Sequence, residues 1–105
     1  MNLIKESIVF LQALTVLPMK QVRMLLKHVN KQQVLAIGEI AKNILAKVIN
    51  IPSEYKDSLK RYKGVIRKLA NPESTSTSRY NTIVSKPEVI ARMVQAVVKK
   101  LLKLV

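Results

Sequence analysis

The sequence predicts an all-α fold, a compact bundle of four or five helices that forms a single domain over residues 1–105. Three observations lead to this prediction. The apolar residues are mainly Leu, Ile, Val and Ala, and aromatic residues make up only 4% of the chain, which favours packed helices over sheets. Only two Gly and four Pro interrupt it, and apolar residues recur at helical spacing along most of its length. A length of 105 residues suits one hydrophobic core and is short for two.

Two helices are expected before residue 30. Residues 3–17 place apolar side chains at helical spacing, and Pro18 should end this helix because a proline disfavours helical backbone in the residue before it. Residues 19–29 carry apolar side chains on one face and basic side chains on the other, which is the pattern of a surface helix.

The third expected helix, from Asn30 to about Val48, is the candidate centre of the core. Asn30 and Gln33 form an amide version of the capping box, a signal for a helix start. Gly38 costs a helix about 1 kcal/mol relative to Ala, so its place in the middle indicates a close contact with another helix. The predicted core residues are Val34, Ile37, Ile40, Ala41, Ile44, Leu59, Tyr62 and Ile66.

A polar segment separates the last two expected helices. The fourth helix is predicted over residues 53–70, with acidic residues in its first turn, where they suit the helix dipole. Residues 71–78 are rich in hydroxyl side chains and predict a polar hinge, and residues 79–84 give no clear pattern. Residues 85–88 read as a capping box with a proline in the first turn, and they open a basic amphipathic C-terminal helix.

The charge of the chain points to a polyanionic partner. Nineteen Lys and Arg residues oppose six Asp and Glu residues, which gives a formal net charge of +13. Residues 1–52 contain seven basic and two acidic side chains, residues 53–70 contain six and two, and residues 71–105 contain six and two. The positive charge therefore belongs to the whole folded body and is not confined to a tail.

The fourth helix carries the densest cations. The predicted nucleic-acid-binding residues are Lys56, Lys60, Arg61, Lys63, Arg67 and Lys68. Lys56, Lys60, Lys63 and Arg67 fall within about 60° of one another on a continuous helix and extend over roughly 16 Å. Such a stripe suits successive phosphates of one DNA strand. A solvated lysine-rich face is the alternative interpretation, because most exposed helices carry one.

Two further nucleic-acid interpretations are weaker. Residues 19–48 can be read as a helix-turn-helix with polar side chains at 31–33, but the third helix is too apolar beyond its first turn and fits the core better. Tyr55, Tyr62 and Tyr80 can stack on bases, although the first two lie on the apolar face of the fourth helix and are expected in the core.

The C-terminal helix allows a membrane or partner interpretation. Its apolar face is broad, and its polar face carries no acid after Glu88. The candidate membrane or partner contacts are Arg92, Lys99, Lys100 and Lys103. We expect this helix to pack onto the domain instead, because a domain of this size needs its best apolar faces.

The residues for catalysis are scarce. The chain has no Cys, one Asp and one His, His28, and its five Glu are scattered singly. No Gly-rich phosphate loop is present, and no Ser or Thr has an evident base beside it. We expect no enzymatic activity, no metal site and no cofactor.

Two segments, EIAKNIL at 39–45 and LKRYKGVIRKLA at 59–70, carry a resemblance that extends over residues 18–70. These residues resemble small basic proteins encoded by Polinton/Maverick-type elements and adintovirus-like DNA viruses of animals. In that family a Gly usually follows the middle helix, whereas AKVIN stands at 46–50 here. The resemblance implies a virus-borne or transposon-borne protein that associates with a genome or a virion, and it carries over no catalytic residue.

The function predicted from these features is non-enzymatic binding or packaging of double-stranded DNA through phosphate contacts. The alternatives are a structural or minor virion protein that binds an acidic protein surface, and a membrane-active protein that uses the C-terminal helix. The longest apolar runs, residues 8–11 and 34–37, are far shorter than the roughly 20 residues that cross a bilayer. We expect an intracellular protein, located in the nucleus or in virions.

Overall fold

Helices account for nearly all of the regular structure. The computed structural model describes the backbone of residues 2–46 and 51–104 and the side chains of residues 3–46 and 51–97, and no strand occurs in these ranges. The helices are α1 (Asn2–Glu6), α2 (Ile8–Val16), α3 (Met19–Lys27), α4 (Lys31–Leu45), α5 (Ser53–Arg61), α6 (Lys63–Ala70), α7 (Ser76–Ser85) and α8 (Pro87–Leu104). The all-α prediction is confirmed. The described chain has eight helices instead of four or five, because two expected helices are each split and α7 is additional.

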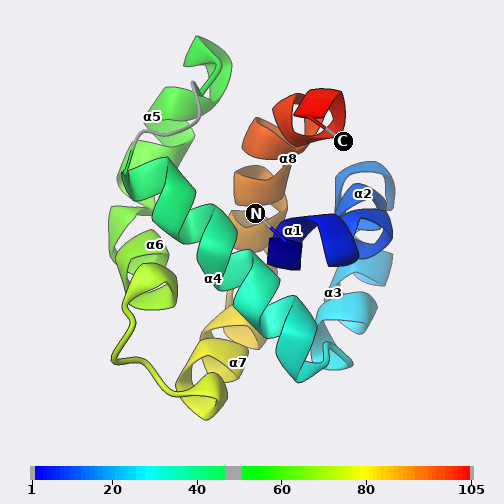
Figure 1. Ribbon diagram of the computed structural model, residues 1–105, viewed down its shortest axis with the longest axis vertical. Coiled ribbons are helices and arrows are strands. Elements are labelled where there is room, and N and C mark those ends of the chain that lie inside the picture. The colour runs from blue at the N-terminus through cyan, green and yellow to red at the C-terminus, as the bar shows by residue number, and fades with distance from the viewer. Residues whose placement is uncertain (1, 47–50, 105) are drawn as a thin grey trace.

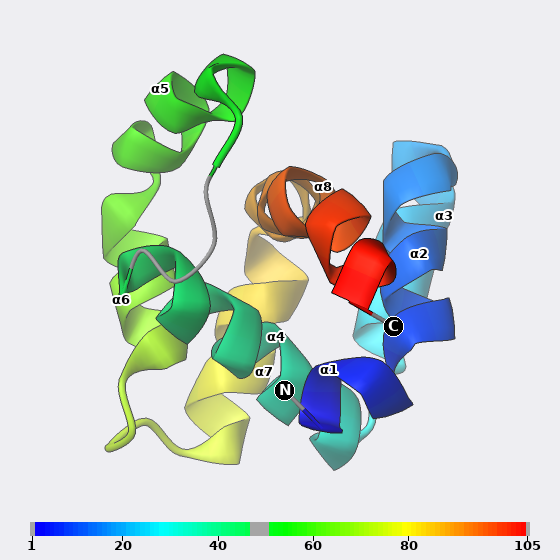
Figure 2. The ribbon, with the colours of Figure 1, turned by 45° about the horizontal axis from the view of Figure 1, so that its top comes forward.

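Two helices, α4 and α8, organise the packing. α4 crosses the middle of the molecule and contacts α1, α6, α7 and α8, whereas α8 contacts α2, α3, α4, α5 and α7 (Figure 1). In the turned view, α8 lies between the α5–α6 side and the α2–α3 side (Figure 2). The resulting body measures 30 × 26 × 26 Å.

The core lies mainly between these two helices and their neighbours. The predicted core residues that are buried are Val34, Ile37, Ile40, Ala41, Leu59 and Ile66. Ile44 and Tyr62, also predicted there, are half-buried and pack against the core from its edge. From α8, the core receives Ile90, Met93 and Val94, which are fully enclosed.

The capping box at the start of α4 forms as predicted. The side-chain oxygen of Asn30 accepts a hydrogen bond from the Gln33 amide at 2.8 Å, and the Asn30 amide donates to the Gln33 side chain at 2.9 Å. These bonds satisfy amides that the first turn of a helix leaves unpaired. α4 ends at Leu45, and the predicted extension to Val48 lies outside the described residues.

The first expected helix is divided at Ser7. The Ser7 amide donates to the Ile4 carbonyl at 3.1 Å, a tighter turn than an α-helix makes, and a new helix then begins. The break allows the two parts to pack on different partners, α1 on α4 and α2 on α8. Hydrophobic periodicity misses it because both parts keep their apolar residues at helical spacing.

The polar segment after α6 is shorter than the predicted hinge at 71–78. Thr75 caps α7 by accepting a hydrogen bond from the Ser78 amide at 3.0 Å, so residues 76–78 are already helical. Residues 71–75 form a turn in which the Asn71 side chain accepts from the Glu73 amide at 3.0 Å. A hydroxyl-rich composition is typical of helix starts as well as of loops, because Ser and Thr side chains cap helices.

α8 packs into the domain, as predicted, and begins at Pro87. Ser85, which was expected to cap it, is instead the last residue of α7, and its hydroxyl donates to the Thr82 carbonyl at 3.1 Å. The side chains of Val89, Ile90 and Val97 are buried. Within the described residues, no helix has the length and apolar character needed to cross a membrane.

Candidate nucleic-acid interface

The predicted cationic residues lie on α5 and α6, which follow one another along one edge of the molecule (Figures 1 and 2). All six are exposed to solvent: Lys56, Lys60 and Arg61 on α5, and Lys63, Arg67 and Lys68 on α6. We call these six residues the α5–α6 basic surface. No acidic residue occurs between Asp57 and Glu73, so the positive charge of this segment is uninterrupted.

The basic surface is not a straight stripe on one helix, and this part of the sequence prediction is wrong. α5 ends at Arg61, and Tyr62 both closes α5 and opens α6, with φ −99° and ψ 17°. Its amide donates to the Leu59 carbonyl at 3.1 Å, and its own carbonyl accepts from the Ile66 amide at 3.1 Å. The cations are therefore divided between two helices, each with an i, i+4 pair about 6 Å apart along its axis.

Local chemistry weakens the helix around Tyr62. Gly64 lowers helix stability by about 1 kcal/mol relative to Ala, and the like charges Lys60 and Lys63, followed by Arg67, repel one another at helical spacing. Tertiary packing favours the break too, because α5 contacts α8 whereas α6 packs mainly on α4. Apolar periodicity runs unbroken through this point and gives no sign of it.

The inner face of α6 is held very close to α4. Ile66 and Leu69 are buried, and a Cβ atom added to Gly38 would lie 3.1 Å from the Leu69 carbonyl oxygen. This contact confirms the close helix approach predicted from Gly38. Because the inner face is committed to the core, the cations of α6 can only face outward.

Arg79 of α7 forms a hydrogen bond at the C-terminal end of α6. Its Nη2 atom donates to the carbonyl of Asn71, the residue that caps α6, at 2.6 Å. The Ser74 hydroxyl donates to the Lys68 carbonyl at 2.9 Å in the same turn. A guanidinium suits this place because the carbonyl end of a helix carries partial negative charge. The Arg79 Nε atom is buried without a hydrogen-bond partner in the described structure.

Arg92 of α8 contacts α5 through Tyr55. Its guanidinium carbon is 5.6 Å from the centre of the Tyr55 ring, so a cation–π contact joins α8 to α5. The sequence placed Arg92 among membrane or partner contacts, together with Lys99, Lys100 and Lys103. The side chains of these three lysines lie outside the described residues.

Among the described side chains, none forms an ion pair with a cation of the basic surface. Among the side chains that the structure describes, the one ion pair joins Arg23 and Glu88 at 3.1 Å, and both partners are more than half exposed. That pair links α3 to α8, and no described carboxylate lies within ion-pair distance of the six basic residues of α5 and α6. Their charge is available to an external anion.

The helix-turn-helix interpretation does not fit the packing. α4 is packed against α1, α6, α7 and α8, and its buried residues extend from Val34 to Ala41, so its middle belongs to the core. In its first turn, Gln33 serves the capping box, and the Gln32 side chain donates to the carboxylate of Glu6.

Over the described residues, no cluster of three His, Cys, Asp or Glu side chains could hold a metal ion.

Comparison of the chain with models of protein families, with curated proteins and with solved structures finds no match. The resemblance to proteins of Polinton/Maverick-type elements therefore stays a prediction. Its two matching pieces, residues 39–45 and 59–70, lie on α4 and on α5–α6, and α4 and α6 pack against each other.

Proposed function

We propose that the chain binds double-stranded DNA through phosphate contacts, with little sequence preference, as a packaging or architectural protein of a virus or mobile element. The observation that carries the proposal is the α5–α6 basic surface, whose six cations are exposed and unpaired with any described carboxylate. The net charge of +13 supports it, since it far exceeds what solubility requires.

Contacts to phosphate are favoured over reading of bases. Lys and Arg supply most protein contacts to the DNA backbone, and such contacts fix position without reading sequence. Readout in the major groove usually requires a helix free to enter it, and α4 is instead committed to the core. We therefore expect affinity that falls steeply as salt rises and varies little between DNA sequences.

The competing function is attachment to an acidic protein surface inside a virion. The same exposed cations would serve it, but the stiff, regular charge of DNA suits two short cationic helices placed in succession. Competition by unrelated duplex DNA and by a polyacidic protein separates the two functions. Release by the polyacidic protein alone would favour the virion contact.

The decisive test compares two variants that each lose four charges. The first changes Lys56, Lys60, Lys63 and Arg67 to Gln. The control changes four exposed lysines on other helices or links, Lys5, Lys20, Lys42 and Lys86, to Gln. Affinity for duplex DNA is measured over a range of salt concentrations, and circular dichroism confirms that both variants fold.

The first variant should lose much more affinity at low salt than the control. Loss of about four phosphate contacts should flatten the dependence of log affinity on log salt by roughly 3 to 4. The control removes the same net charge without removing docked contacts. Equal losses in the two folded variants would show that net charge alone drives binding, and the basic surface would then be ordinary solvated surface.

A further inference from the structure

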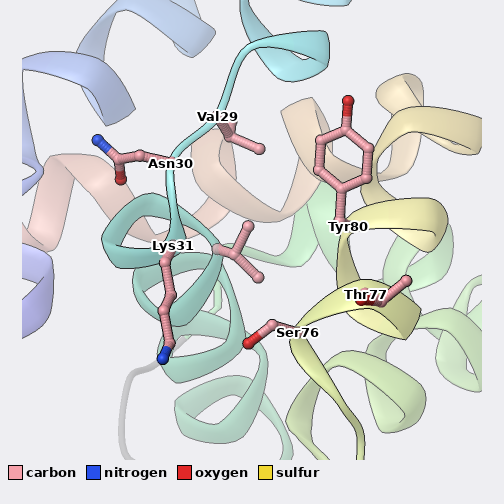
Figure 3. Close-up of a pocket in the computed structure, with 7 residues that line it drawn as sticks. Val29, Asn30, Lys31, Ser76, Thr77 and Tyr80 are labelled. Carbon is pink, nitrogen blue, oxygen red and sulfur yellow. The ribbon is translucent and has the colours of Figure 1, made fainter.

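An open pocket lies between the start of α4 and the start of α7, on residues that the basic surface does not include (Figure 3). Its volume is about 350 Å³. Val29 and Val34 supply an apolar wall, and the aromatic ring of Tyr80 supplies a second. A pocket with these walls favours a flat organic group over a hydrated ion.

The rim of the pocket carries hydrogen-bond donors. Lys31 comes from α4, and Ser76 and Thr77 come from α7. All three are exposed, and the Ser76 hydroxyl points toward the side of α4 on which Lys31 lies (Figure 3). None of the described residues that line the pocket carries a carboxylate, so the rim is positive and suits an anion.

The Tyr80 ring is held in place before any ligand binds. Its hydroxyl donates to the Lys27 carbonyl at the end of α3, at 2.6 Å. This bond ties α7 to α3 and fixes the ring at the pocket wall. A ring that is already fixed loses little conformational entropy when a planar group stacks on it.

We propose that this pocket binds one unpaired nucleotide, with the base against Tyr80 and Val29 and the phosphate on Lys31 and Ser76. The fixed aromatic ring and the apolar wall can hold a base, and the cationic rim can hold a phosphate. A nucleoside phosphate contacts all of these at once and should therefore bind more tightly than a base or a phosphate alone. The nucleotide can come from an unpaired position of a nucleic-acid strand or from a free nucleoside monophosphate. The site is separate from the duplex interface on α5 and α6 and does not depend on it.

The test measures binding of adenosine monophosphate and of a short single-stranded oligonucleotide to the full chain by calorimetry. Lys31→Glu should weaken both by about tenfold or more, because it reverses the charge at the phosphate. The variant should fold, since a carboxylate in the first turn of α4 suits the helix dipole. Lys20→Glu is the matched control, because Lys20 is exposed in the first turn of α3 and does not line the pocket.

The ring is tested separately. Tyr80→Phe keeps the ring but removes the bond to Lys27 that holds it, so it should lose less affinity than Tyr80→Ala. Tyr80→Ala should lose about 5- to 150-fold, the range expected for loss of base stacking. If the free nucleotide and the strand both bind, the pocket is a general nucleotide site. If only the strand binds, the nucleotide that occupies the pocket comes from a nucleic-acid strand. The proposal is overturned if neither ligand binds, if Lys31→Glu and Lys20→Glu lose equally, or if inorganic phosphate binds as tightly as the nucleotide. Duplex affinity, measured in parallel, tests the α5–α6 surface and is independent of these outcomes.

Discussion

The two glycines give a direct test of the contact that positions the basic surface. Both lie in helices, Gly38 in α4 and Gly64 in α6, but their surroundings differ. A Cβ atom at Gly38 would lie 3.1 Å from the Leu69 carbonyl oxygen, which is backbone and cannot rotate away. A Cβ atom at Gly64 would meet no other group within 4 Å.

The two Ala substitutions should therefore change the free energy of unfolding by different amounts, or in opposite directions. Each substitution should raise the free energy of unfolding by about 0.5–1 kcal/mol, because Ala restricts the unfolded chain and favours the helix. Gly64→Ala should keep this gain as added stability. Gly38→Ala must also push α4 and α6 apart by a few tenths of an ångström, and overpacking of this kind costs about 1–3 kcal/mol. We expect Gly38→Ala to be less stable than Gly64→Ala by about 1–3 kcal/mol.

Thermal and urea unfolding followed by circular dichroism measure the difference. One kcal/mol shifts the midpoint temperature of a domain of this size by about 4–8 °C, so the two variants should separate clearly. Equal stabilisation in both would refute the reasoning, since it would mean that α4 and α6 do not approach at Gly38. Gly38→Val, which adds an isopropyl group at the contact, should be the least stable of the three.

Other parts of the packing give further predictions. Ile90→Ala should lower the free energy of unfolding by about 2–5 kcal/mol, because α8 is part of the core; a loss under about 1 kcal/mol would mean that α8 is detached. Asn30→Ala should cost about 1 kcal/mol through loss of the α4 cap, which urea unfolding can measure. Arg79→Ala should cost about 1.5–3 kcal/mol by freeing the end of α6, again by urea unfolding. Glu88→Gln should change stability by less than about 1 kcal/mol, since its pair with Arg23 is exposed.

Sequence periodicity predicted which residues are buried better than where helices end. Val34, Ile37 and Ile40 are buried as predicted, because their spacing places them on one side of a helix whatever that helix packs against. The breaks at Ser7 and Tyr62 leave this spacing intact. They depend on which partner each half of the helix meets, and that is a property of the tertiary structure.

The residues of the candidate site also fall into those that the sequence pattern predicted and those that depend on the tertiary structure. Exposure of Lys60 and Arg67 followed from their place opposite an apolar face, and the structure agrees. Arg92 contacts Tyr55 from a distant part of the sequence, and Arg79 reaches Asn71 at the end of α6 from eight residues away, across a polar turn. Helical periodicity reveals neither contact. Tyr80 could be named as a stacking residue, but its pocket exists only where α7 meets α4, and α7 itself was not predicted.

The packing and the charge both support the proposed polyanionic partner. The inner face of α6 must be apolar because α4 approaches within contact of its backbone at Gly38, and this forces every cation of the helix outward. The side chains that the structure describes offer those cations no carboxylate. Self-repulsion among unpaired like charges destabilises the compact state, and a bound polyanion relieves it by binding the folded form. A bound polyanion would satisfy the outer surface of α6 while its inner face stays in the core, and this supports our proposal of a polyanionic partner over a merely solvated face.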